Sequence, residues 1–139
     1  MAEKTIDIAS PILSRNERLA DQLRQRFKET GTYVINVLSS PGSGKTTTIL
    51  GTNERLRDKA GLRCAVIEGD IASDVDAITM KEAGMPAIQI NTGGLCHLEG
   101  NMIMEAVDAF DQAVGLQNID VIFIENVGNL VCPVDFDLG

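Results

Sequence analysis

A glycine-rich loop between an apolar run and a helix-compatible segment constrains the fold of this chain more than any other stretch. Residues 39–46 read Ser-Ser-Pro-Gly-Ser-Gly-Lys-Thr, and they directly follow the apolar run at residues 33–38. Gly42 and Gly44 allow a backbone curl whose N–H groups point inward at an anion, next to the positive end of a helix. The pattern therefore predicts a phosphate-binding loop.

The residues that close this loop carry the chemistry of a nucleotide site. Lys45 supplies a mobile positive charge for the outer phosphates, and Thr46 supplies a hydroxyl that can ligate Mg²⁺. Ser39 stands where the strict pattern G-x-x-x-x-G-K-[ST] has its first glycine, so an ordinary turn before a helix is the alternative. The strand and helix on either side favour nucleotide binding, and the nucleotide-binding residues that we predict are Gly42, Ser43, Gly44, Lys45, Thr46 and Thr47.

Composition excludes several classes of function. The chain has 139 residues, enough for one domain, and no apolar run approaches the ~20 residues that would span a bilayer. Residues 1–7 lack a basic region followed by an apolar core, so we expect a soluble, cytoplasmic protein without a membrane partner. A net charge of −8 argues against a nucleic-acid partner, because phosphate backbones are bound by clustered Lys and Arg. The three cysteines are expected to be thiols or ligands rather than disulfides.

Apolar runs alternate with helix-compatible segments along the chain. Ser14 and Glu17 have capping-box spacing, so we expect a helix from Ser14 to Gly31, after a flexible lead-in at residues 1–13. The alternation predicts an α/β fold, a P-loop NTPase sandwich with a mainly parallel sheet and helices on both faces. The expected strands are 33–38, 62–67, 87–90 and 120–124, and the further helices are 46–60, 74–83 and 98–114.

Polar side chains with metal-binding chemistry follow three of these strands. Asp70 follows the second, Cys96 and His97 follow the third, and Cys132 follows the fourth. The carboxyl ends of parallel strands meet at one edge of a sheet, so these residues could converge beside the phosphate loop. Thiolate and imidazole suit Zn²⁺ or Ni²⁺, and three ligands would invite more from a second subunit. A turn or capping role for Asp70, and buried or turn cysteines beside a surface histidine, are the alternatives from spacing alone. Cys64 lies inside a strand and is expected in the core.

Four motifs in this order resemble the nickel-insertion GTPases of hydrogenase maturation, called HypB. They are the loop at 39–46, Glu-Gly-Asp at 68–70, the stretch Gln-Ile-Asn-Thr-Gly-Gly-Leu-Cys-His-Leu at 89–98 and Ile-Glu-Asn-Val-Gly-Asn-Leu-Val-Cys-Pro at 124–133. The resemblance covers residues 14–139, and the family's loop also carries serine at the position of Ser39.

The resemblance implies roles for individual residues. Lys45 and Thr46 would hold the β- and γ-phosphates of GTP or GDP with Mg²⁺, and Asp70 would be the switch carboxylate near Mg²⁺. Glu125 would begin the segment that senses the γ-phosphate. The resemblance thus implies a GTPase whose catalytic residues are Lys45, Thr46, Asp70 and Glu125, with Thr46 and Asp70 at magnesium.

The resemblance also implies a metal site and partners. Cys96, His97 and Cys132 would bind Ni²⁺ or Zn²⁺ at the interface of a nucleotide-dependent homodimer. GTP would close two subunits together, and hydrolysis would release the ion to a partner nickel chaperone or to the hydrogenase large subunit.

This chain departs from the family in two respects. It has no Cys-rich or His-rich N-terminal segment, so tight nickel storage there is not expected. No Asn/Thr-Lys-x-Asp motif, whose carboxylate reads guanine, occurs in it, so we expect an incomplete GTPase domain at 14–139 with its C-terminal strands missing and with poor base discrimination.

Other interpretations remain open at this level. A metal-binding or dimerisation module without nucleotide hydrolysis is one, and a urease-type or cobalamin-mutase-type accessory GTPase is another. The Cys96-His97 pair favours the hydrogenase type. A small-molecule kinase is disfavoured because no Arg-rich lid is apparent, and ATPases of the ParA/MinD type are disfavoured because Ser40 stands where they have a second lysine.

Overall fold

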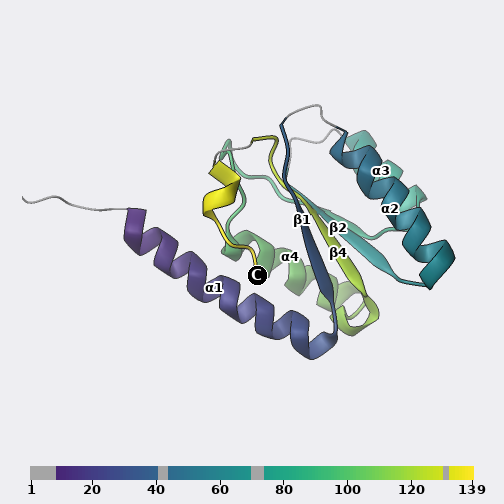
Figure 1. Cartoon of the computed structure of the whole chain (residues 1–139), viewed down its shortest axis with the longest axis horizontal. Coiled ribbons are helices and arrows are strands. Elements are labelled where there is room, and N and C mark those ends of the chain that lie inside the picture. The colour runs from purple at the N-terminus through teal and green to yellow at the C-terminus, as the bar shows by residue number, and fades with distance from the viewer. Residues whose placement is uncertain (1–8, 41–43, 70–73, 130–131) are drawn as a thin grey trace, which may run out of the picture.

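The chain forms a four-stranded parallel sheet between two layers of helices (Figure 1). The computed structural model describes residues 9–40, 44–69, 74–129 and 132–139. Within them the strand order is β1-β4-β2-β3, and every neighbouring pair is parallel. The strands are β1 (Tyr33–Val37), β2 (Cys64–Glu68), β3 (Ala87–Gln89) and β4 (Val121–Glu125).

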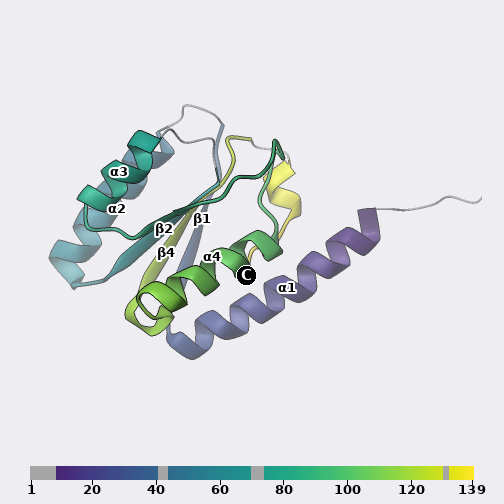
Figure 2. The same ribbon diagram turned by 180° about the vertical axis from the view of Figure 1, so that it is seen from behind.

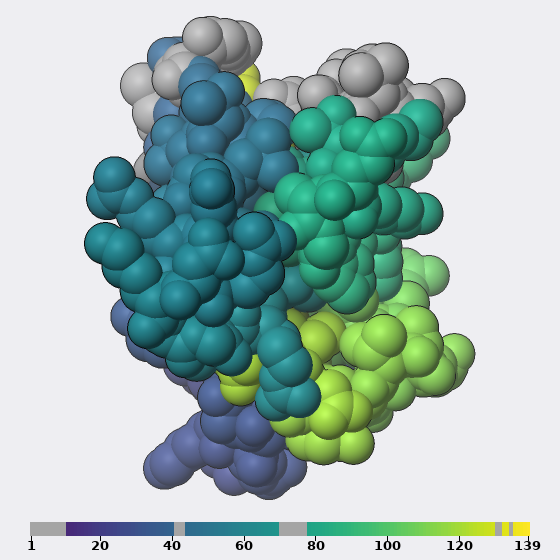
Figure 3. Space-filling view, turned by 90° about the vertical axis from the view of Figure 1, so that its right-hand side faces the viewer, coloured from purple at the N-terminus to yellow at the C-terminus, as the bar shows by residue number. Residues whose placement is uncertain are grey.

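The helices cover both faces of this sheet. In Figure 2, α4 lies in front of the sheet with α1 alongside it, and Figure 3 shows α2 and α3 packed side by side over the other face. This arrangement confirms the predicted α/β sandwich. The helices are α1 (Ala9–Thr30), α2 (Lys45–Ala60), α3 (Asp74–Glu82) and α4 (Gly100–Ala113), with short 3₁₀ turns η1 (Leu116–Asn118) and η2 (Cys132–Asp135).

The two central strands, β2 and β4, are buried throughout and supply both cores. Alternate residues point to opposite faces of a strand, so Ala65 and Ile67 pack toward α1 and α4, whereas Cys64 and Val66 pack toward α2 and α3. Cys64 therefore lies in the core, as predicted. A strand covered on both faces has to be apolar throughout, which explains the unbroken hydrophobic runs in the sequence.

The helix α1 begins earlier than the sequence pattern indicates. It starts at Ala9, so the expected flexible lead-in is wrong for residues 9–13, and residues 1–8 lie outside the described chain. Pro11 falls in the first turn, where its missing N–H has no intrahelical partner to lose and its fixed φ suits the helix. The capping-box pair Ser14 and Glu17 consequently lies inside the helix rather than at its start.

No helix in the described part of the chain combines the length and the apolar character that crossing a bilayer requires.

Candidate functional site

The predicted phosphate-binding loop leads into α2, which begins at Lys45, one residue before the expected start. Gly44 caps α2 with a φ of +90°, a left-handed conformation that residues with a Cβ adopt at a cost. Lys45 is the first residue of α2 and is only 6% exposed, and exposed Thr47 follows in the same turn. Gly42 and Ser43 fall outside the described residues, as does Asp70. The described part of the loop thus joins β1 to a helix N-terminus, where an anion is favoured.

Carboxylates at the ends of two neighbouring strands lie next to this helix. The Thr46 hydroxyl donates to Glu125 Oε1 at 2.8 Å, which joins α2 to the end of β4. Glu125 is 6% exposed, and Glu68, its register partner on β2, is 1% exposed. Two buried carboxylates and a hydroxyl are oxygen donors of the kind that Mg²⁺ prefers. The residues present therefore fit a magnesium site, although the sequence analysis left Glu68 out of it. A single acidic residue that ends an otherwise apolar parallel strand was the available signal for Glu68.

A buried asparagine ties the segment after β4 to the strand that precedes the phosphate loop. Asn126 is fully buried, and its side-chain amide donates to Asn36 Oδ1 at 3.1 Å. Its backbone N–H donates to the Val37 carbonyl at 3.2 Å, and Asn126 Oδ1 accepts from the Val127 N–H at 2.8 Å. The predicted γ-phosphate-sensing segment therefore begins on a fixed anchor. In the sequence, the only signal for Asn126 is its place in the motif at residues 124–133.

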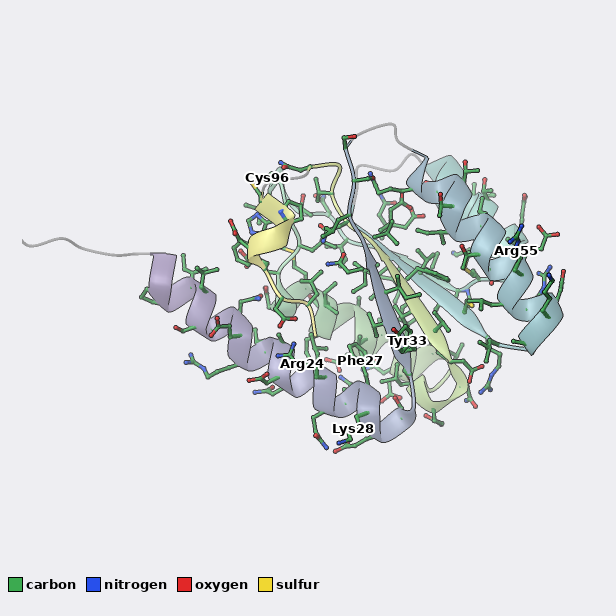
Figure 4. All side chains as sticks on the ribbon, in the orientation of Figure 1. Arg24, Phe27, Lys28, Tyr33, Arg55 and Cys96 are labelled. Atoms are coloured by element: carbon green, nitrogen blue, oxygen red, sulfur yellow. The ribbon has the colours of Figure 1, made fainter. Side chains whose placement is uncertain are left out.

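The sulfur and imidazole groups lie at the same edge of the sheet. Figure 4 places Cys96 beside η2, at the end of the sheet opposite Lys28 and Tyr33. Cys96 Sγ is 3.7 Å from His97 Nδ1, and the thiols of Cys96 and Cys132 are near enough to shift each other's pKa. The structure thus brings all three predicted ligands into one neighbourhood, which we call the sulfur–imidazole cluster (Cys96, His97 and Cys132).

Hydrogen bonding in the cluster separates the acidities of its two thiols. The hydrogen bond with Cys132, followed by the one with His97, lowers the pKa of Cys96 below its ordinary value. The same bond to Cys96 raises the pKa of Cys132, with burial adding to the effect. Burial alone would lower the pKa of His97, but its hydrogen bonds to Cys96 and Glu99 outweigh burial and raise it. The interaction of the two thiols therefore favours a thiolate within the pair, which is the form that ligates a metal ion.

The imidazole of His97 is held by groups outside the thiol pair. Its Nε2 is 3.0 Å from Glu99 Oε1, and its ring stacks on Phe136 with centroids 3.9 Å apart and planes 10° apart. Across the described residues, no three His, Cys, Asp or Glu side chains are arranged in a group that could hold a metal ion. The three side chains of the cluster therefore lie near one another in pairs and do not form a complete three-ligand metal site.

One close packing contact connects the two halves of the site. Gly69 comes directly before Asp70, and a Cβ built on Gly69 would lie 2.5 Å from Leu98 Cδ1 and 2.7 Å from Leu98 Cγ. Leu98 is fully buried and comes directly after His97. Only glycine fits here without displacing Leu98, since a core at native density leaves no room for an added methyl group. The strand end that leads to the predicted switch carboxylate thus packs on the loop that carries two of the predicted metal ligands.

Known proteins resemble this chain in sequence and in structure. The model of the CobW/HypB/UreG nucleotide-binding domain matches residues 33–137. The hydrogenase/urease maturation factor HypB of Helicobacter hepaticus is 45% identical over 137 residues, covering 99% of this chain and 55% of that protein. The hydrogenase maturation factor HypB of Escherichia coli is 46% identical over 136 residues, covering 98% of this chain and 45% of that protein.

Two solved structures of HypB have the same fold. The structure from Helicobacter pylori in complex with nickel superimposes with a TM-score of 0.78 at 42% identity, covering 90% of this chain and 56% of that one. The structure from Archaeoglobus fulgidus gives a TM-score of 0.80 at 39% identity, covering 91% and 58%. The chain spans about half the length of these relatives. Because the family model matches most of its residues, the chain belongs to the CobW/HypB/UreG family of nucleotide-binding domains.

Proposed function

We propose that this chain is the nucleotide- and metal-binding part of a nickel-insertion GTPase of the HypB type, which acts in the maturation of [NiFe] hydrogenase. The observation that carries the proposal is that side chains suited to a nucleotide and side chains suited to a metal ion lie at the same edge of the sheet. Thr46 of α2, which follows Lys45, donates to the buried carboxylate of Glu125, and the sulfur–imidazole cluster follows β3 and β4 at the same edge. A nucleotide at the first site and a metal ion at the second would lie close enough to influence each other.

At the nucleotide, each residue has a distinct task. Lys45 neutralises the outer phosphates of GTP or GDP, and the N-terminus of α2 adds its positive end. The Thr46 hydroxyl and Asp70 would hold Mg²⁺, and the ion would supply positive charge to neutralise the phosphate oxygens. Glu125 keeps the Thr46 hydroxyl in place through their 2.8 Å hydrogen bond. With Asp70, these residues form the catalytic set that we propose.

At the metal, Ni²⁺ or Zn²⁺ is cargo rather than a resident cofactor. Cys96 supplies the thiolate, Cys132 a second sulfur, and His97 an imidazole nitrogen. The pairwise arrangement of the cluster is in keeping with a homodimer in which two copies contribute ligands to one ion. Hydrolysis of GTP would then separate the copies and release the ion to a nickel chaperone or to the hydrogenase large subunit.

The link between the two events runs through packed segments. Glu125 and Asn126 begin the segment that leads to Cys132, and Gly69 packs on Leu98 beside His97. A change at the γ-phosphate that moves either segment also moves a metal ligand. A urease-type accessory GTPase is a second candidate function, because the Helicobacter hepaticus relative is named for both hydrogenase and urease maturation.

Release of inorganic phosphate tests the enzymatic part of the proposal. We expect the protein to release phosphate from GTP in the presence of Mg²⁺, and to do so faster than Lys45→Ala in the same assay. ATP provides the comparison for base preference. Phosphate release no faster than that of Lys45→Ala would contradict the GTPase and would favour a metal-binding module that does not hydrolyse nucleotide.

A further inference from the structure

The side chain of Asn16 on α1 joins two segments that are distant in sequence. Asn16 is 5% exposed, and its Oδ1 accepts from the Gly100 N–H at 2.6 Å. Its Nδ2 donates to the Asp137 carbonyl at 2.7 Å. Because one partner is a donor and the other an acceptor, the orientation of the amide is fixed, and both of its functional groups are used.

These two partners lie just beyond the metal-ligand candidates. Gly100 follows His97 by three residues, and Asp137 follows Cys132 by five. A Cβ on Gly100 would lie 3.1 Å from Asn16 Oδ1 and 3.1 Å from Leu19 Cβ, so glycine allows the start of α4 to approach α1 closely. Asn16 therefore contacts the continuation of both segments that contribute to the cluster.

Further contacts hold the second segment against α1. Arg24 forms an ion pair with the carboxylate of Asp137, and Leu138 is 4% exposed in the core beside Leu23. Figure 1 shows the last residues running back along α1 from η2. Phe136, between these anchors and η2, is the residue that stacks on His97. The position of the His97 ring thus depends on how residues 136–138 are seated on α1.

We propose that Asn16 is a positioning residue for the sulfur–imidazole cluster, one that holds the Cys96-His97 segment and the Cys132 segment at a fixed separation. The amide does not touch the ligands. It sets how often the two thiols and the imidazole are close enough to act together. The relevance to metal binding rests on the proposed function above, whereas the effect on the thiol pair does not.

The effective concentration of Cys96 toward Cys132 measures this positioning without any metal. Equilibration in glutathione redox buffers, followed by peptide mapping, gives the equilibrium constant for the intramolecular Cys96–Cys132 disulfide. Loss of one or two net hydrogen bonds predicts that Asn16→Ala lowers this constant about tenfold. Asn16→Asp retains the acceptor for Gly100 but turns a carboxylate oxygen toward the Asp137 carbonyl, so the bond to that segment is lost and a decrease is expected for this variant too.

Asn53→Ala provides the matched control. Asn53 is also a buried asparagine, 4% exposed, and its amide donates to the Ala83 carbonyl under the opposite face of the sheet. Its replacement should lower the melting temperature comparably but leave the disulfide constant unchanged. Circular dichroism checks the fold of each variant, and Asn16→Asp carries the test if Asn16→Ala does not fold. Equal disulfide constants in the wild type and in the folded Asn16 variants would overturn the proposal.

A parallel titration with Ni²⁺ against a chromophoric chelator separates this inference from the proposed function. If the wild type does not bind Ni²⁺ but Asn16→Ala still lowers the disulfide constant, the positioning role holds and the metal function fails. If the wild type binds Ni²⁺ and Asn16→Ala changes neither quantity, the metal function holds and the positioning role fails. Lower values of both in Asn16→Ala, with Asn53→Ala unchanged, are the result that we expect.

Discussion

Lys45→Ala should abolish measurable nucleotide binding. Lys45 is the first residue of α2 and is only 6% exposed, so its side chain is not free in solvent. Its loss removes the positive charge nearest to the outer phosphates, and charge-assisted hydrogen bonds are the strong ones. We expect the affinity for GDP to fall on the order of 100-fold or more, which corresponds to the loss of one or two such bonds.

Calorimetric titration with GDP in Mg²⁺ checks this result, and a titration with ADP shows whether the base contributes. Lys59→Ala is the matched control, because Lys59 is an exposed lysine in the last turn of the same helix. Its replacement should leave the affinity unchanged. Equal affinities of Lys45→Ala and the wild type for GDP would contradict the assignment of residues 39–46 as a phosphate-binding loop.

Cys96→Ala and Cys132→Ala should each remove most of the bound Ni²⁺ or Zn²⁺. The two thiols interact closely enough to shift each other's pKa, so we expect both to reach one ion, and the interaction lowers the pKa of Cys96, which favours the thiolate. Loss of either sulfur leaves a set too small to hold a soft-ligand ion tightly. We expect the metal content after gel filtration to fall to a small fraction of the wild-type value.

Cys64→Ala is the control for this experiment. Cys64 is a free thiol buried in β2, and burial raises its pKa. Its replacement should cost some stability through the loss of packing but no bound metal. Full metal retention in either Cys96→Ala or Cys132→Ala would show that the two cysteines do not share a site.

The fold was largely predictable because its signals are local. The strands β2 and β4 are apolar throughout, since both of their faces are covered, and Gly61 ends α2 in the left-handed conformation expected of a helix-terminating glycine. The start of α1 was not predictable from its capping box. Ser14 has the right local pattern, but the helix extends back to Ala9, past a proline that the first turn tolerates.

The site was only partly predictable, because its remaining residues act through tertiary contacts. The convergence of Cys96 and Cys132 followed from the rule that parallel strands end at one edge. The roles of Asn16 and Asn126 depend on which groups they hydrogen-bond in the folded chain. For Asn16 these groups lie 84 and 121 residues away in the sequence. The pairing of Glu68 with Glu125 follows only from the strand order, which places the two residues side by side. No pattern in a single sequence specifies that order.

The central claim is that the nucleotide and the metal ion influence each other. Its most direct test is the affinity of the wild-type protein for Ni²⁺, measured against a chromophoric chelator in saturating Mg²⁺·GDP and then in a saturating non-hydrolysable GTP analogue. We predict affinities that differ by about fivefold or more, the lower end of a typical coupling between sites. Identical affinities in the two nucleotide states, with both nucleotides shown to be bound, would contradict the account.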